Sequence, residues 1–355
     1  MGPLSLLKGI KSKKIMSWQN EFKDALKTNE DLEKFFDQKF SKITYPLFIP
    51  RNFAKKILDF GPDSPLWKQF LPHENENLSV GGLYDPIGDR LHAKGNQLIH
   101  RYDNRVLFTP TTVCPIICRY CFRKNELADK AEIFNQNFLE AKNYLRANPE
   151  INEVIFTGGD PLILSNEKLA GFIQEFSEIE TIKYIRFHSR TPIILPSRID
   201  EGFIEIMTSA KLLFKRSMIM IHINHLAEID EYVEAAINLL TESGIEVFSQ
   251  TVLLKDVNDQ TEILAALFTH LADLKVTPYY LHHPDQTLGA MHFTMSLEEG
   301  RRIVQPLHNQ LPGWAIPQYV IDIPGGEGKV LALNSEGFEF SGSLINRHGK
   351  KILLK

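Results

Sequence analysis

The feature that most constrains this chain is a repeat of short apolar segments rich in β-branched and aromatic residues. They lie at residues 105–113, 153–160, 184–190, 217–225, 247–254 and 278–283. After the first, they recur about every thirty residues, and amphipathic helical patterns such as residues 228–245 lie between them. Strand and helix alternating at this distance predict βαβ units and a parallel sheet. Six units favour an α/β fold built on a partial (β/α)6 barrel, with an open doubly wound sheet as the alternative.

The repeat also divides the chain into four regions. Residues 1–15 are basic and contain no acid, and we expect a flexible leader there. Residues 16–99 predict a helical N-terminal region and a connecting loop. The barrel is expected over residues 100–295, and residues 296–355 are expected to form a C-terminal extension with a helix, a glycine-rich lysine loop and a terminal hairpin. In either α/β fold, functional side chains are expected at the carboxyl ends of the parallel strands.

The composition and net charge indicate which kinds of binding partner to expect. Of the 355 residues, 43% are apolar and 24% are charged, which is the balance of a globular protein. The formal net charge of −4 gives no reason to expect nucleic acid or an anionic membrane as a partner. No apolar stretch reaches the roughly 18 residues that suggest a membrane-spanning helix.

The chain has three cysteines, Cys114, Cys118 and Cys121, crowded just after the first expected strand. An odd number in so short a segment is a poor disulfide framework and indicates a reducing compartment, so a cytoplasmic location is expected. Thiolates are soft ligands that suit an iron–sulfur cluster or zinc. A structural zinc site needs four ligands, so a histidine would have to replace the missing cysteine.

The spacing of these cysteines is C-x3-C-x2-C, with an aromatic residue before the last one. It resembles the signature of radical S-adenosylmethionine (SAM) enzymes. The resemblance implies that the three cysteines hold three irons of a [4Fe–4S] cluster and that SAM binds the fourth iron.

A Thr-Gly-Gly-Asp segment ends the second expected strand. Such a segment taken alone is a common turn. At this place it resembles the radical SAM motif for the amino group of SAM, which implies a cofactor-binding role for Gly158, Gly159 and Asp160. Glycine suits that role because it lets backbone carbonyl groups approach an ammonium group closely.

The segment PGGEGK at residues 324–329 is the second informative motif. It lacks the spacing and the trailing hydroxyl of a phosphate-binding loop. A lysine in a flexible glycine-rich segment can form a Schiff base with pyridoxal phosphate (PLP) and move away when substrate replaces it. The segment resembles the PGGGGK of lysine 2,3-aminomutases, which implies that Lys329 holds PLP. Glu327 replaces a glycine of that pattern.

The resemblance to lysine 2,3-aminomutases extends over residues 50–335 and implies roles for further side chains. Arg101 and Arg105 would bind the PLP phosphate, a task that suits the arginine fork, although they could otherwise be solvated rim residues. Arg123 would pair with the substrate carboxylate. Asp285 and Asp322 would hold the distal ammonium group of lysine. A glutamate 2,3-aminomutase would lack such an acidic pair, because buried carboxylates repel a third one.

Polar residues also end the fourth and sixth expected strands; they are His222, Asn224, His225, His282 and His283. A mononuclear metal site is one interpretation, although no carboxylate lies at a matching spacing. By resemblance, His222 and Gln250 instead lie where lysine aminomutases contact SAM.

The resemblance implies an isomerase that converts L-lysine to β-lysine through a 5′-deoxyadenosyl radical and a PLP-assisted 1,2-amino shift. It implies an electron donor such as a flavodoxin or ferredoxin, and it is compatible with a homo-oligomer. Lacking further cysteines, the chain looks most like the short bacterial branch that serves translation elongation factor P and its lysine ligase.

Other functions remain to be compared with this one. Within the family they are a free-standing lysine 2,3-aminomutase of catabolism or osmolyte synthesis, and an aminomutase for another amino acid. Outside it they are a sulfur-inserting or methylthiolating radical SAM enzyme, which usually needs a second cluster, and a non-catalytic iron–sulfur protein, which has no use for Lys329 and its paired arginines.

Overall fold

The computed structural model describes seven stretches of the chain: residues 17–42, 45–78, 80–95, 97–129, 138–333, 343–345 and 351–353. The leader expected at residues 1–15 lies outside them, as do residues 334–342, where the terminal hairpin was expected to begin.

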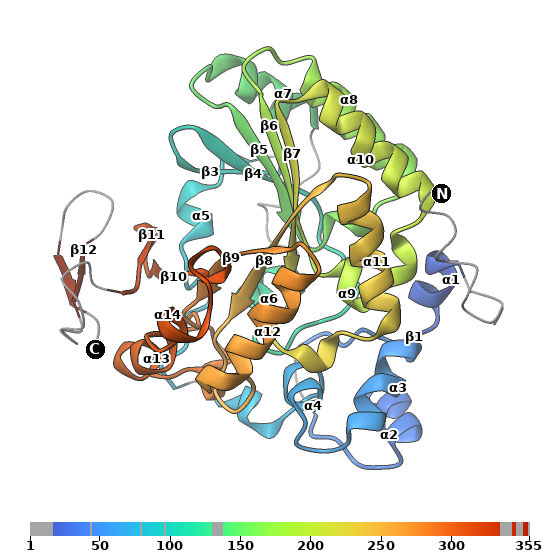
Figure 1. The fold of residues 1–355 in the computed structure, drawn as a ribbon, viewed down its shortest axis with the longest axis vertical. Helices are drawn as coiled ribbons and strands as arrows, with labels where there is room; N and C mark the ends of the chain where they lie inside the picture. The colour runs from blue at the N-terminus through green and yellow to red at the C-terminus, as the bar shows by residue number, and fades with distance from the viewer. Residues whose placement is uncertain are drawn as a thin grey trace.

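A nine-stranded sheet forms the centre of the described structure (Figure 1). The six expected strands are confirmed as parallel neighbours; they are β4 (Arg105–Thr111), β5 (Glu153–Gly158), β6 (Tyr184–Ser189), β7 (Arg216–His222), β8 (Glu246–Val252) and β9 (Thr277–His282). Strands that follow one another in the chain are neighbours throughout the sheet, so its order never reverses. A doubly wound sheet needs such a reversal, and the sheet is therefore a partial barrel.

Three strands extend the expected set. β10 (Gln318–Ile323) runs parallel to β9, and β11 (Gly328–Leu331) folds back against β10. β3 (Leu98–Tyr102) pairs antiparallel with β4 at the opposite edge, although its first residues were expected in a loop. The glycine-rich lysine loop therefore joins two strands of the barrel sheet.

Helices connect the parallel strands, as the amphipathic patterns predict; they are α6 (Lys124–Asp129), α7 (Phe138–Ala147), α8 (Asn166–Ser177), α9 (Thr191–Ile194), α10 (Glu201–Leu213), α11 (Glu231–Glu242), α12 (Thr261–Asp273), α13 (Leu297–Val304) and α14 (Leu307–Gln310). On α11 the buried residues are Val233, Ala236, Ile237 and Leu240, which form one stripe at helical spacing. Gly244 follows with φ of +69°, a conformation that favours glycine where a helix stops.

The N-terminal region is helical, as expected; its elements are α1 (Trp18–Lys23), β1 (Ala25–Leu26), α2 (Asn29–Phe36), β2 (Ile49–Pro50), α3 (Arg51–Phe60), α4 (Pro65–Phe70), the 3-10 turn η3 (Glu74–Asn77) and α5 (Asp89–His92). In Figure 1 its first helices lie together at one end of the barrel. Near the C-terminus, β12 (Ser343–Ile345) and β13 (Lys351–Leu353) pair with each other.

Along β7, side chains point alternately into the hydrophobic core and into the interior of the barrel. On β7, Ile219 and Ile221 belong to the hydrophobic core, whereas Met218, Met220 and His222 line a cavity. This explains why the strand appears as an unbroken apolar run in the sequence.

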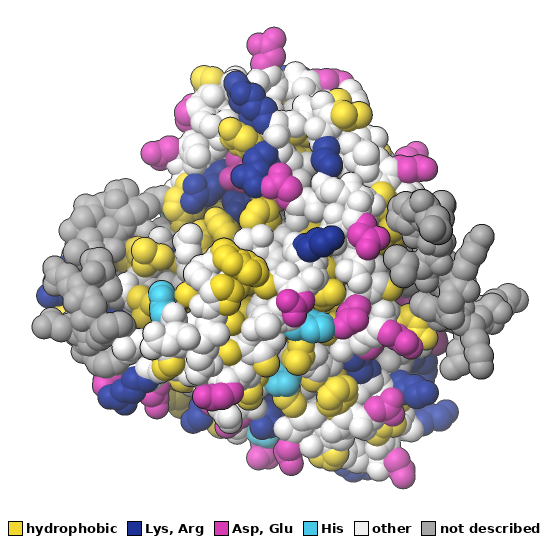
Figure 2. Space-filling model, viewed as in Figure 1, with side chains coloured by type: hydrophobic (Ala, Val, Ile, Leu, Met, Phe, Trp, Pro, Cys, Tyr) yellow, Lys and Arg dark blue, Asp and Glu magenta, His cyan; other side chains and the backbone are white. Residues whose placement is uncertain are grey.

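The outer surface is mixed in character. The face shown in Figure 2 carries acidic and basic side chains interspersed with apolar ones. No helix among the described residues is both long enough and apolar enough to cross a membrane.

Candidate active site

A cavity of about 1030 Å³ opens inside the barrel. Every residue that the sequence motifs single out as a site residue lines it; these are Arg101, Arg105, Cys114, Cys118, Cys121, Arg123, Gly158, Gly159, Asp160, His222, Gln250, Asp285, Asp322 and Lys329. Most lie at carboxyl ends of strands, as expected. Arg105 is an exception, because it begins β4. Small-molecule sites typically measure about 300–1,000 Å³, so this cavity lies at the upper end of that range.

The loop that carries Cys114, Cys118 and Cys121, called the cysteine loop below, lines one part of the cavity. Its three thiols are free and partly buried. Burial raises the pKa of all three, to about 11 for Cys121, where the neighbouring Cys118 adds to the effect. Thiols in such surroundings become thiolates readily only when a cation lies beside them, so the loop fits a cationic iron–sulfur cluster.

A site for a single metal ion is not formed. Among the described residues, no three His, Cys, Asp or Glu side chains converge on one point. Cysteines that each bind a different iron of a cluster need not converge in this way. In the alternative metal site at the end of β7, His225 Nδ1 accepts from the amide of Ala227 and Asn224 Oδ1 accepts from the amide of Val252, so these two atoms are already engaged.

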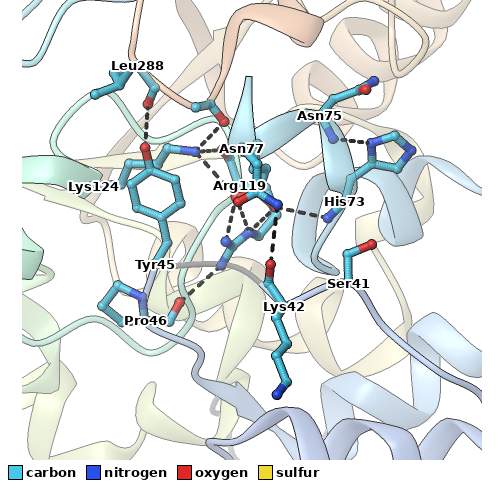
Figure 3. Close-up of polar contacts among 12 residues, drawn as sticks. Ser41, Lys42, Tyr45, Pro46, His73, Asn75, Asn77, Arg119, Lys124 and Leu288 are labelled. Atoms are coloured by element: carbon cyan, nitrogen blue, oxygen red, sulfur yellow. Dashed lines mark hydrogen bonds and ion pairs between the residues drawn. The ribbon is translucent and has the colours of Figure 1, made fainter. Parts of the chain in front are cut away.

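A buried ionic network includes Arg119 of the cysteine loop and the nearby Lys124 (Figure 3). Arg119, between Cys118 and Cys121, donates from Nε and NH2 to Glu76, with distances of 2.5–3.1 Å. Lys124 Nζ lies 3.4 Å from Glu76 and donates to the carbonyls of Arg119 and Gly289 at 2.9 and 2.5 Å. Sequence analysis missed Glu76. Two cations beside the cysteine motif were the available signal that a buried acid had to pair with them.

We expect Glu76→Gln to destabilise the protein by about 3–5 kcal/mol, because it leaves two buried cations without their shared anion. Chemical denaturation gives the free energy of unfolding, and iron retention after reconstitution reports on the cysteine loop. Glu33→Gln is the control, since Glu33 pairs with Lys39 on the surface, and no measurable change is expected there. Unchanged stability in Glu76→Gln would contradict the role of this network.

The two glycines at the end of β5, Gly158 and Gly159, are required by close backbone contacts. Gly158 has φ of +106°, and a Cβ on it would lie 2.8 Å from the carbonyl oxygen of Thr111. A Cβ on Gly159 would collide with the backbone of Thr112 and Val113. The glycines therefore bring the end of β5 against the residues that lead into the cysteine loop.

Asp160 has its carboxylate oxygens occupied. Oδ1 accepts from Leu162 N and Ser189 Oγ at 3.0 and 2.7 Å, and Oδ2 accepts from the amides of Arg190 and Thr191 at 2.7 and 3.0 Å. The side chain thus ties the end of β5 to the end of β6, which leaves the backbone of this segment as the part able to contact a ligand.

Further along the same rim, His222 and Gln250 are register partners on β7 and β8. Burial lowers the pKa of His222 to about 3, so its ring is neutral. Its Nε2 is buried without a hydrogen-bond partner among the described residues. A buried polar atom of this kind is normally satisfied, so a ligand is a fitting partner for it.

Lys329 also lines the cavity. The β10–β11 register places it directly across from Asp322, with which it forms an ion pair. Its Nζ lies 3.2 Å from Nδ1 of His282, and its amide donates to the hydroxyl of Tyr102 on β3 at 2.8 Å. Burial and the charge of Lys329 lower the pKa of His282 well below its usual range, so that ring is neutral.

The turn that carries Lys329 needs glycine at three positions. Gly325, Gly326 and Gly328 have φ of +86°, +82° and +91°. Glu327 is not among the residues with positive φ, which explains why a side chain is tolerated at this position.

The arginines and Asp285 complete the lining. Arg101 lies 3.7 Å from Asp322, and Arg105 stacks 3.9 Å above the ring of Tyr102. Arg123 is buried and donates from NH1 to Thr157 Oγ1 at 3.1 Å. Burial and the nearby Asp322 raise the pKa of Asp285 to about 8. A buried acid with a strongly shifted pKa in a cavity is a candidate functional residue.

The chain is similar to known proteins over most of its length. The Radical SAM superfamily model matches residues 108–268. The L-lysine 2,3-aminomutase of Escherichia coli is 35% identical over 84% of this chain and 86% of its own length. The L-lysine 2,3-aminomutases of Buchnera aphidicola and Clostridium subterminale are 32% and 29% identical, over 92% and 91% of this chain and 98% and 79% of their own lengths.

Proposed function

Because the chain belongs to the L-lysine 2,3-aminomutase family of radical SAM enzymes and is therefore an isomerase, we propose that it converts L-lysine to β-lysine. The observation that carries this proposal is one cavity lined by the cysteine loop, Lys329, and charged groups suited to both ends of lysine. Arg123 matches its carboxylate, and Asp285 with Asp322 matches its distal ammonium group.

Membership of the radical SAM superfamily implies a [4Fe–4S] cluster and SAM. We propose Cys114, Cys118 and Cys121 as the cluster ligands, and the Gly158–Asp160 backbone, His222 and Gln250 as contacts for SAM. When bound, the cluster and SAM would supply 5′-deoxyadenosyl radical chemistry for hydrogen abstraction from the substrate. The chain's part is to hold the substrate near the cysteine loop and to exclude water by enclosing the site.

For PLP we propose Lys329 as the covalent anchor and Arg101 and Arg105 as partners of its phosphate. PLP supplies a conjugated system over which an unpaired electron spreads during the amino shift. The neutral ring of His282 lies next to Nζ of Lys329 and can accept a hydrogen bond from that amine. Asp322 then exchanges its partner, pairing first with Lys329 and then with the ammonium group of the substrate.

The test is anaerobic incubation of the reconstituted protein with SAM, PLP, dithionite and L-lysine, followed by chromatography. We expect β-lysine as the product. If methionine and 5′-deoxyadenosine form without β-lysine, the lysine assignment fails and other amino acids become the candidates. L-glutamate is the matched negative substrate, because Asp285 and Asp322 would repel its side-chain carboxylate.

Lysine binding is expected to depend on pH through Asp285. Its carboxyl group is largely neutral below its pKa of about 8 in the ligand-free protein, and only the charged form attracts an ammonium group strongly. Binding must therefore release a proton, and the apparent affinity for lysine should rise up to about tenfold per pH unit below pH 8. The substrate's distal amine stays charged there, because its pKa is about 10.4.

Lysine KM measured between about pH 6 and 9 checks this expectation. Asp285→Asn should raise KM and remove its pH dependence, whereas Asp273→Asn, on the exposed end of α12, should do neither. If lysine KM still depends on pH in Asp285→Asn, the proton released on binding comes from another group.

We further propose that the β-lysine serves the modification of translation elongation factor P, together with the lysine ligase of that factor. The support is the resemblance to the short bacterial branch. Mass spectrometry of elongation factor P from cells with and without this gene tests this role. If the β-lysine modifies the factor, the β-lysyl mass is lost in cells without the gene; if it serves lysine catabolism, the mass of the factor is unchanged.

A further inference from the structure

One buried carboxylate lies between two of the arginines that line the cavity. Asp89 begins α5 and is 0% exposed. Its Oδ1 accepts from NH2 of Arg101 at 2.8 Å. Its Oδ2 lies 2.8 Å from Nε and 2.7 Å from NH2 of Arg123. Each oxygen therefore serves a different guanidinium group, and the two arginines are linked through a single side chain.

The backbone holds this carboxylate in place. The Asp85 side chain accepts from the amides of Asp89 and Arg90, both at 2.9 Å, and so caps the first turn of α5. Gly88 has φ of +72°, and a Cβ on it would lie 2.5 Å from the amide nitrogen of Gly326. The segment 85–92 is therefore packed against the loop that carries Lys329.

The balance of charge favours anionic ligands. Arg101 and Arg123 share one carboxylate, so the three side chains together keep one positive charge. All three are almost fully buried, with side-chain exposures of 8%, 5% and 0% for Arg101, Arg123 and Asp89. A buried carboxylate held by two guanidinium groups fixes both of them, because moving either one leaves charge unpaired.

We propose that Asp89 is a positioning residue that sets the distance between the phosphate end and the substrate-carboxylate end of the site. This inference rests on the proposed function, which gives Arg101 to the PLP phosphate and Arg123 to lysine. It predicts that PLP affinity and lysine KM change together when Asp89 changes, although Asp89 itself touches neither ligand.

The experiment compares Asp89→Asn with Asp89→Glu in the reconstituted holoenzyme. Asp89→Asn keeps the shape and loses the charge, and we expect about a 10- to 100-fold rise in both PLP Kd and lysine KM. Asp89→Glu keeps the charge and lengthens the side chain, and about a 3- to 10-fold rise in both is expected. PLP binding is read from its visible absorption, and iron content and the Kd for SAM should stay unchanged.

Glu126→Gln is the matched control. Glu126 is also a buried acid of this neighbourhood, but it forms its ion pair with Arg90, at 3.4 Å, so both constants should stay within twofold of wild type. If Asp89→Asn does not fold, Asp89→Glu decides. PLP Kd and lysine KM both unchanged in a folded Asp89 variant would overturn the inference. A wild-type protein that binds no PLP would instead overturn the proposed function.

Discussion

Lys329→Ala should reduce β-lysine formation by at least about a thousandfold, because it removes the proposed covalent anchor of PLP. The visible absorption of protein-bound PLP should disappear with it. The cysteine loop lies in another part of the cavity, so iron content and slow reductive cleavage of SAM should persist. The measurement pairs product chromatography with absorption spectra of the same reconstituted samples.

Lys329→Arg separates the two tasks of this residue. Arginine keeps the positive charge beside Asp322 but cannot form the covalent link, so it should be as inactive as alanine. Lys255→Ala, at an exposed position, is the control and should be fully active. More than about a tenth of wild-type activity in Lys329→Arg would show that the ion pair, and not the covalent bond, is what the reaction needs.

Cys118→Ala should remove both activities at once. With one ligand lost, we expect the reconstituted protein to hold little iron. Formation of 5′-deoxyadenosine and formation of β-lysine should each fall by at least about a thousandfold. This pattern differs from that of Lys329→Ala, in which only the second product is lost. Iron analysis and electron paramagnetic resonance of the reduced protein report on the cluster directly.

Val113→Ala is the control for the cysteine loop. Val113 precedes the loop and its side chain is 45% exposed, so iron content and both products should be retained. A Cys118→Ala protein with full iron content would contradict the assignment of this thiol.

Periodicity carried most of the fold prediction. Runs such as residues 217–225 and 247–254 are buried on both sides by helices and by the barrel interior, which makes them apolar and regularly spaced. Functional residues were expected at the carboxyl ends of strands, and this expectation singled out the Gly158–Asp160 segment, which would otherwise be a common turn. Lys329 was found because its loop has a recognisable pattern of glycines.

Residues outside regular patterns were missed. Asp89 and Glu76 lie in a segment without periodicity, and they bond to arginines 34 and 43 residues later in the chain. Nothing local marks such a residue, because its role exists only once two loops have met. β10 was missed as a barrel strand for a related reason: its pairing with β9 becomes visible only after α13 and α14 are placed.

The contact between Tyr102 and Lys329 joins two strands at opposite ends of the sheet order, 227 residues apart in the chain. Contacts at such separation have the highest loop-closure entropy, so they form only after the intervening strands are in place. Under the proposed function, the place for PLP is therefore organised only when both edges of the sheet are in position, which predicts that attachment of that cofactor is a late step of maturation.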